Sequence, residues 1–179
     1  YNKLAPELKA SNKGKNLNQI LMQINQSKVG SIAPNFTLID IDGHSLSLNS
    51  FRNKSIILLD FWASWCTPCR SEFPFLKDLY KKYHSKGFEI IGISRDEEIK
   101  LWKKAIKNDD IRMWRQISTK KNDNKILSDY FVSAVPLKIL IDKDGRIIGR
   151  WRGGGELNQI ELLTQISKYL DFFNPYTHL

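Results

Sequence analysis

Residues 56–70, IILLDFWASWCTPCR, join a continuous apolar run to a pair of cysteines. Residues 56–62 are almost entirely apolar, which is typical of a central parallel strand that is buried on both faces. Cys66 and Cys69 follow this run directly and stand where a helix over residues 70–86 is about to begin. The stretch therefore predicts a buried strand that leads through a short turn into a helix, with both cysteines at its start.

The position of the two cysteines favours redox chemistry. Unpaired backbone N–H groups and the helix dipole stabilise an anion at a helix entrance, so we expect a thiolate at Cys66. Cys69 lies one turn further along the same side of the helix, close enough to resolve a mixed disulfide at Cys66. Pro68 is tolerated between them, because the missing N–H of a proline costs nothing in a first helical turn.

Two other interpretations of the cysteine pair are weaker. A structural zinc ion needs about four ligands, but His84 is the only histidine within easy reach downstream and no second C-x-x-C follows. A pair of inert buried thiols does not suit a helix entrance beside Trp65. The chain has only two cysteines, which excludes a framework of structural disulfides. We therefore expect no metal, and no cofactor other than a redox-active Cys66–Cys69 disulfide.

The rest of the chain alternates between strand and helix patterns. Further strands are expected over residues 88–93, 114–117, 137–141 and 146–151. Helices are expected over residues 70–86, 96–108, 122–131 and 156–173. Ahead of them, the turn signal Asp42-Gly43 predicts a β-hairpin whose alternating apolar positions are Phe36, Leu38, Ile41, Leu46 and Leu48. This order indicates an α/β fold with a central mixed sheet flanked by helices.

Residues 1–30 are polar and rich in lysine. Apolar residues recur there at helical spacing, at Leu17, Ile20, Leu21 and Ile24. We expect a short amphipathic helix whose stripe is buried on this domain or on a missing upstream segment. The chain is divided into an N-terminal extension, residues 1–29, and one domain, residues 30–175. It starts at Tyr1, so we interpret it as a processed or trimmed product from which any targeting segment has been removed.

Composition narrows the class of protein. The chain has 179 residues and 41% hydrophobic content, enough for one domain with a full core. Its formal net charge is +9, but the lysines are scattered and no dense arginine stripe appears, so we expect solvated helix faces rather than nucleic-acid binding. No apolar run approaches the ~20 residues of a membrane helix.

Several motifs together resemble one protein family. They are residues 33–38 with Asp42-Gly43, residues 61–70 with Glu72 and Pro74, Val135-Pro136, and residues 141–148. They resemble the Trp-Cys-x-x-Cys active site of the thioredoxin superfamily and, more narrowly, the TlpA/ResA-type (AhpC/TSA-related) thioredoxin-like proteins of bacterial envelopes. The resemblance covers about residues 30–170 and implies a thioredoxin fold with an N-terminal β-hairpin extension.

The resemblance implies catalytic roles for four residues. Cys66 would be the attacking thiolate and Cys69 the resolving thiol. Pro136 would follow a cis peptide bond and face the cysteine pair, the alternative being an ordinary trans proline at the start of a strand. Asp60 would exchange a proton with Cys69, as the buried acid of thioredoxins does, unless it is a structural aspartate at the end of a strand.

A second set of residues would bind the substrate: Trp65, Thr67, Pro68, Glu72 and Val135. The backbone of Val135 is expected to receive a substrate strand, and Trp65 to pack beside the cysteines and shield them. Glu72 would shape the substrate cavity, or is instead a first-turn glutamate favoured by the helix dipole. Leu137 stands where thioredoxins commonly have threonine, which indicates a more apolar peptide-binding strip.

These residues imply a thiol–disulfide oxidoreductase, most simply a reductase of disulfides in proteins of the bacterial periplasm or cell envelope. Its partners would be protein disulfide substrates and an upstream electron donor, and one task in the family is to prepare cytochrome c cysteines for haem attachment. An oxidant or an isomerase would use the same residues. We expect a monomer, and a membrane tether through a missing N-terminal segment stays open.

Two functions from other classes are the alternatives. A peroxidase of the peroxiredoxin branch would share the Ala-Pro-x-Phe hairpin, but its Pro-x-x-x-Thr-x-x-Cys motif is absent, because Leu59 and Ala63 occupy those places before Cys66. A non-enzymatic module would hold a peptide in the cleft beside Pro136. The intact cysteine pair argues against that module.

Overall fold

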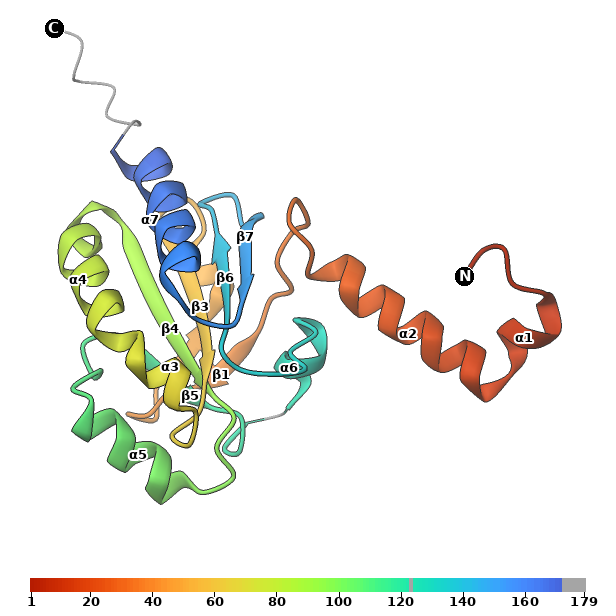
Figure 1. The fold of residues 1–179 in the computed structure, drawn as a ribbon, viewed down its shortest axis with the longest axis horizontal. Helices are drawn as coiled ribbons and strands as arrows, with labels where there is room; N and C mark the ends of the chain where they lie inside the picture. The colour runs from red at the N-terminus through yellow and green to blue at the C-terminus, as the bar shows by residue number, and fades with distance from the viewer. Residues whose placement is uncertain (123, 172–179) are drawn as a thin grey trace, which may run out of the picture.

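The computed structural model describes residues 1–122 and 124–171. A mixed five-stranded sheet forms its centre, with the strand order β5-β4-β3-β6-β7 (Figure 1). The strands are β3 (Ile56–Trp62), β4 (Phe88–Ser94), β5 (Arg115–Ser118), β6 (Leu137–Ile141) and β7 (Ile147–Arg152). Strands β3, β4 and β5 pair in parallel, whereas β6 pairs antiparallel with both β3 and β7. The predicted α/β fold with a central mixed sheet is therefore confirmed.

Strand β3 is the middle of the sheet because it buries side chains on both faces. All seven of its residues are buried. Ile56, Leu58 and Trp62 point into one apolar cluster, while Ile57 and Leu59 point into the other. A strand in this position needs an apolar residue at nearly every place, which is the pattern that predicted it.

Helices cover the two faces of the sheet unequally. The helices are α3 (Thr67–Ser71), α4 (Phe73–Tyr83), α5 (Ile99–Asn108), α6 (Lys125–Asp129) and α7 (Glu156–Leu170), with 3₁₀ turns η1 (Leu48–Phe51) and η2 (His84–Lys86). Side chains of α4, α5 and α7 enter the cluster that contains Trp62 and both cysteines. The opposite cluster is closed by α6 and by the hairpin of β1 (Thr37–Ile39) and β2 (Ser45–Ser47). The hairpin thus serves as the cover of one face of the sheet.

Residues before the hairpin form α1 (Pro6–Ala10) and α2 (Asn12–Gln26), which extend away from the sheet (Figure 1). The predicted amphipathic helix is present, but its stripe is not buried on the domain. Leu17 is 41% exposed and Ile24 is 39% exposed. Within residues 1–122 and 124–171, no helix combines the length and apolar character that a membrane span requires.

The helix expected over residues 70–86 begins earlier, at Thr67, and is broken at Glu72. The break has a local cause, because Pro74 has no N–H with which to continue the hydrogen-bond ladder. Glu72 joins the two segments with φ −89° and ψ −11°. The break turns Glu72 inward, where it is 3% exposed.

The other boundaries differ from the predicted ones by a few residues. Helix α5 begins at Ile99 rather than residue 96, α6 is shorter than residues 122–131, and Leu48 opens η1 instead of continuing the return strand. The expected end of the last helix at residue 173 and of the domain at residue 175 lie outside the described residues.

Replacing Leu58 by alanine should lower the free energy of unfolding by about 2–5 kcal/mol, because a side chain with 0% exposure leaves a cavity in β3. Urea unfolding followed by tryptophan fluorescence measures the loss. The matched control is Ile160→Ala on α7, where the side chain is 53% exposed and the change should stay within about 0.5 kcal/mol. Equal effects at the two positions would contradict the central placement of β3.

Candidate active site

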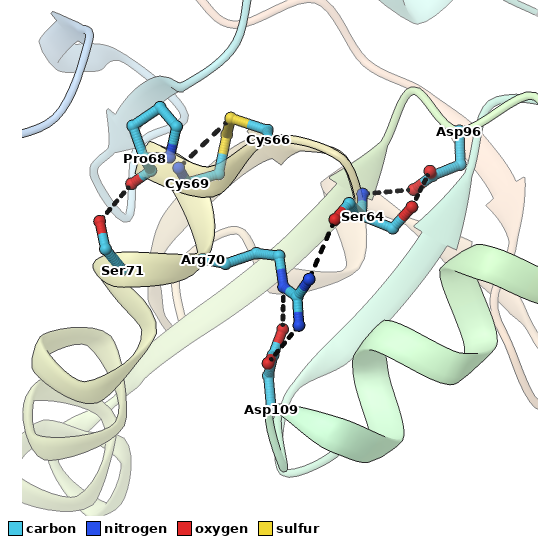
Figure 2. Close-up of polar contacts among 8 residues, drawn as sticks. All are labelled: Ser64, Cys66, Pro68, Cys69, Arg70, Ser71, Asp96 and Asp109. Atoms are coloured by element: carbon cyan, nitrogen blue, oxygen red, sulfur yellow. Dashed lines mark hydrogen bonds and ion pairs between the residues drawn. A yellow bond between two sulfur atoms is a disulfide. The ribbon is translucent and has the colours of Figure 1, made fainter.

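The two cysteines meet where β3 turns into α3, and they form a disulfide with a Cα–Cα distance of 5.3 Å (Figure 2). Cys66 is the N-cap residue of α3, and its Sγ accepts a hydrogen bond from the backbone N–H of Cys69 at 3.3 Å. Cys66 is 4% exposed and Cys69 is 2% exposed. The sulfur of Cys66 is therefore the one with a backbone donor aimed at it, as the helix entrance predicted.

One clamp holds the turn before the cysteines from the side of β4. Buried Asp96 accepts hydrogen bonds from the backbone N–H of Ser64 at 2.9 Å and from its hydroxyl at 2.5 Å (Figure 2). Ser94 donates a further bond to the same carboxylate at 2.7 Å. Sequence reasoning missed Asp96, although a charged residue just past a buried strand is a signal that was available.

A second clamp holds the cysteine helix from the side of α5. The guanidinium of Arg70 donates two hydrogen bonds to Asp109, at 2.7 and 2.8 Å, and a third to the carbonyl oxygen of Ser64 at 3.2 Å (Figure 2). The hydrogen bond to Asp109 raises the pKa of Arg70. Arg70 therefore ties α3 both to the end of α5 and to the turn that carries the first cysteine.

The peptide bond between Val135 and Pro136 is cis, as predicted. Pro136 immediately precedes β6, whose Leu137 pairs with Phe61 near the end of β3, so this bend lies at the cysteine end of the sheet. Val135 packs against both apolar clusters, one of which contains the cysteines. Leu137 does not widen a substrate strip, because it is 1% exposed and belongs to the core behind it.

Trp65, which was expected to shield the cysteines, is largely exposed. Its side chain is 65% exposed, whereas Trp62, three places back on β3, is fully buried. Trp65 stands in the turn between β3 and α3, just before Cys66. Thr67 and Pro68 are exposed as well. These three side chains form an accessible rim beside a buried disulfide.

Behind the disulfide, three charged side chains are buried together. Asp60 on β3 lies directly across from Lys138 on β6, and the Lys138 Nζ to Asp60 Oδ1 distance is 3.5 Å. Lys138 also donates a hydrogen bond to Glu72 Oε2, and the backbone N–H of Gly155 donates to Glu72 Oε1 at 3.2 Å. Glu72 is therefore not a solvated first-turn glutamate but a member of a buried ionic group.

Burial raises the pKa of Asp60; the charge of Lys138 opposes this effect and that of Glu72 adds to it. For Lys138, burial alone would lower the pKa of the ammonium, but Asp60 and Glu72 outweigh it and the pKa is raised. Sequence reasoning missed Lys138. The available signal was a lysine inside the apolar strand LKILI, a position where an isolated charge would be costly.

Candidate metal ligands gather elsewhere. In the part of the chain that the structure describes, Asp40, Asp42 and His44 are the side chains close enough to share an ion, and they lie on the hairpin turn. Two of them are already ion-paired, Asp40 with Arg115 at 3.5 Å and Asp42 with Arg112. The cysteine pair is not a member of this cluster.

Comparisons with known proteins agree with this geometry. A family model described as the AhpC/TSA family matches residues 29–164. A thiol-disulfide oxidoreductase ResA from Bacillus thuringiensis subsp. konkukian is 36% identical over 134 residues, which are 75% of each protein.

Two solved structures share the fold. The thioredoxin domain of a thiol-disulfide oxidoreductase from Bacteroides vulgatus is 36% identical with a TM-score of 0.70, covering 80% of this chain and 98% of that domain. A thiol:disulfide interchange protein from a Bacteroides species is 36% identical with a TM-score of 0.71, covering 84% and 95%. The chain thus belongs to the AhpC/TSA family, and within it to the thioredoxin-fold thiol–disulfide oxidoreductases.

Proposed function

We propose that this protein reduces disulfides in other proteins, with Cys66 as the attacking thiolate and Cys69 as the resolving thiol. The observation that carries the proposal is the hydrogen bond from the Cys69 N–H to the Cys66 sulfur at the entrance of α3. Such a donor stabilises negative charge on one sulfur of the pair and not on the other. The names of the relatives support the same reaction class.

The reaction moves two electrons from the dithiol to the substrate. The Cys66 thiolate attacks one substrate sulfur, forms a mixed disulfide and releases the other substrate sulfur as a thiolate. Cys69 then loses its proton and attacks the Cys66 sulfur, which restores the internal disulfide and releases the second substrate sulfur. An upstream dithiol donor must return two electrons to the pair before the next cycle.

Asp60 is proposed as the group that takes the proton from Cys69. Its place on β3 gives it the same sheet face as Trp62, whose cluster includes both cysteines. Its raised pKa suits proton exchange near neutral pH, because a base works best when its pKa lies near the working pH. Asp60 Oδ1 lies 3.5 Å from the Lys138 ammonium, which favours the ionised form that can accept a proton.

The rim of Trp65, Thr67 and Pro68, together with the backbone of Val135, is proposed to receive the substrate chain. An exposed tryptophan beside a buried disulfide offers a large apolar contact that costs little to desolvate. We further propose that the protein works in the bacterial cell envelope as a monomer without a bound cofactor, and that an upstream donor supplies its electrons.

The direction of the reaction is tested by the reduction potential of the cysteine pair, measured in glutathione or dithiothreitol buffers by thiol labelling. A reductase should show a value near that of thioredoxin, about −270 mV. A value nearer to about −120 mV would make the protein an oxidant and overturn the proposed direction.

The roles of the two cysteines are tested by serine variants. Cys69→Ser should accumulate a stable mixed disulfide with a protein substrate such as insulin, because the attack by Cys66 survives and resolution does not. Cys66→Ser should form no such adduct and should lose reductase activity, as non-reducing gels and mass spectrometry would show. An adduct that forms only through Cys69 would reverse the assignment.

The burial of Asp60 should make the free energy of unfolding depend on pH. Because its pKa is raised in the folded protein, the folded state holds this proton at pH values where the unfolded chain has released it. The free energy of unfolding therefore falls as the pH rises from about 4 through the raised pKa, and the stabilisation present at low pH is lost above it.

Asp60→Asn cannot ionise, so it should be more stable than the wild type at neutral pH and should match it most closely near pH 4. Urea unfolding across this pH range measures the difference. The matched control is Asp78→Asn on α4, whose side chain is 81% exposed and which should follow the wild-type curve. A constant offset between Asp60→Asn and the wild type at every pH would contradict the titration of Asp60.

A further inference from the structure

Lys138 is a charged residue in the interior of a sheet. It is 4% exposed and, of the lysines and arginines in residues 1–122 and 124–171, it is the one that is buried. Its neighbours on β6, Leu137 and Ile139, are core residues. A well-packed apolar side chain at such a place is often as stabilising as an ion pair, so stability alone does not account for a lysine there.

Lys138 lies against two carboxylates, those of Asp60 and Glu72, behind the cysteine pair. The strand register sets it opposite Asp60, and the break between α3 and α4 sets Glu72 above it. Asp60 and Lys138 face the side of the sheet that holds the cysteines, since Trp62 on β3 and Leu140 on β6 do so at the same alternation. Glu72 reaches this side through its ion pair with Lys138. Two carboxylates thus share one ammonium.

The two carboxylates are held differently. Glu72 accepts one hydrogen bond from Lys138 and one from the Gly155 N–H, so each of its oxygens is occupied. Asp60 is ion-paired with the same ammonium through its Oδ1, at 3.5 Å. Lys138 therefore contacts both carboxylates, and Glu72 is held by one more donor than the ammonium that it shares with Asp60.

We propose that Lys138 is a positioning residue for the resolving step: shared between Glu72 and Asp60, its ammonium keeps Asp60 ionised in the buried site and so able to take the proton from Cys69. This inference rests on the proposed function. Burial and the charge of Glu72 both favour the neutral form of Asp60, and Lys138 is the cation that opposes them. Glu72 in turn holds Lys138 in place.

The proposal makes opposite predictions for the two neighbours of Asp60. Lys138→Met removes the opposing charge, so the pH midpoint of the resolving step should move up by about one unit or more. Glu72→Gln removes a negative charge near Asp60, so the midpoint should move down. A purely structural role predicts lower thermal stability in both variants with the midpoint unchanged.

The experiment is a single-turnover reaction of the fully reduced protein with a small aromatic disulfide between pH 5 and 9. The two leaving thiols report separately on attack by Cys66 and on resolution by Cys69. Below the wild-type midpoint, Lys138→Met should resolve about tenfold more slowly while the attack phase keeps its rate. Lys138→Arg should restore the midpoint, and Lys143→Met, at an exposed position, should behave as the wild type.

The outcomes separate the two proposals. If the wild type shows no attack phase, the proposed function fails. If attack occurs but the resolution midpoint is the same in the wild type, Lys138→Met and Glu72→Gln, the role of Lys138 is overturned. Should Lys138→Met not fold, the downward shift in Glu72→Gln decides the matter, together with a ¹³C NMR titration of the Asp60 carboxyl in that variant and the wild type.

Discussion

The antiparallel pairing of β3 with β6 is the constraint on which the site depends. One register places Asp60 opposite Lys138 and brings the bend at Pro136 to the end of β3, where the cysteine turn begins. A slip of one residue would send Asp60 and Lys138 to opposite faces, because side chains alternate along a strand. The apolar residues on both faces of β3 hold that register, so the core and the active site are specified by the same pairing.

This pairing also explains how three charges can be buried behind a disulfide. An unpaired charge in the core would be prohibitive, but Lys138 lies between two carboxylates, and Glu72 gains a further backbone donor from Gly155. The arrangement leaves the group one positive charge short of neutral when both acids are ionised. The net negative charge of that state favours uptake of a proton. Cys69 must release a proton before it attacks, and this group can accept it.

Local patterns predicted the parts of this site that lie close together in the sequence. The run before Cys66, the helix entrance and the proline before β6 all carry their signals within a few residues. Lys138 was missed because its partner lies on another strand: a lysine in an apolar run indicates a buried charge, but its partner is identified only when the register is known. The large exposure of Trp65 was not predicted for the related reason that exposure depends on what the fold brings over a turn.

Two clamps hold the backbone of the cysteine turn in place. Asp96 holds Ser64 from one side, and Arg70, bound to Asp109, holds it from the other (Figure 2). The Cα–Cα distance of 5.3 Å lies within the range that a disulfide needs. The hydrogen bonds of Asp96 and Arg70 hold the backbone of this turn, which keeps the two cysteines close when the dithiol gives up two electrons and the S–S bond forms. A preorganised turn therefore lets resolution depend on the proton of Cys69 rather than on movement of the chain.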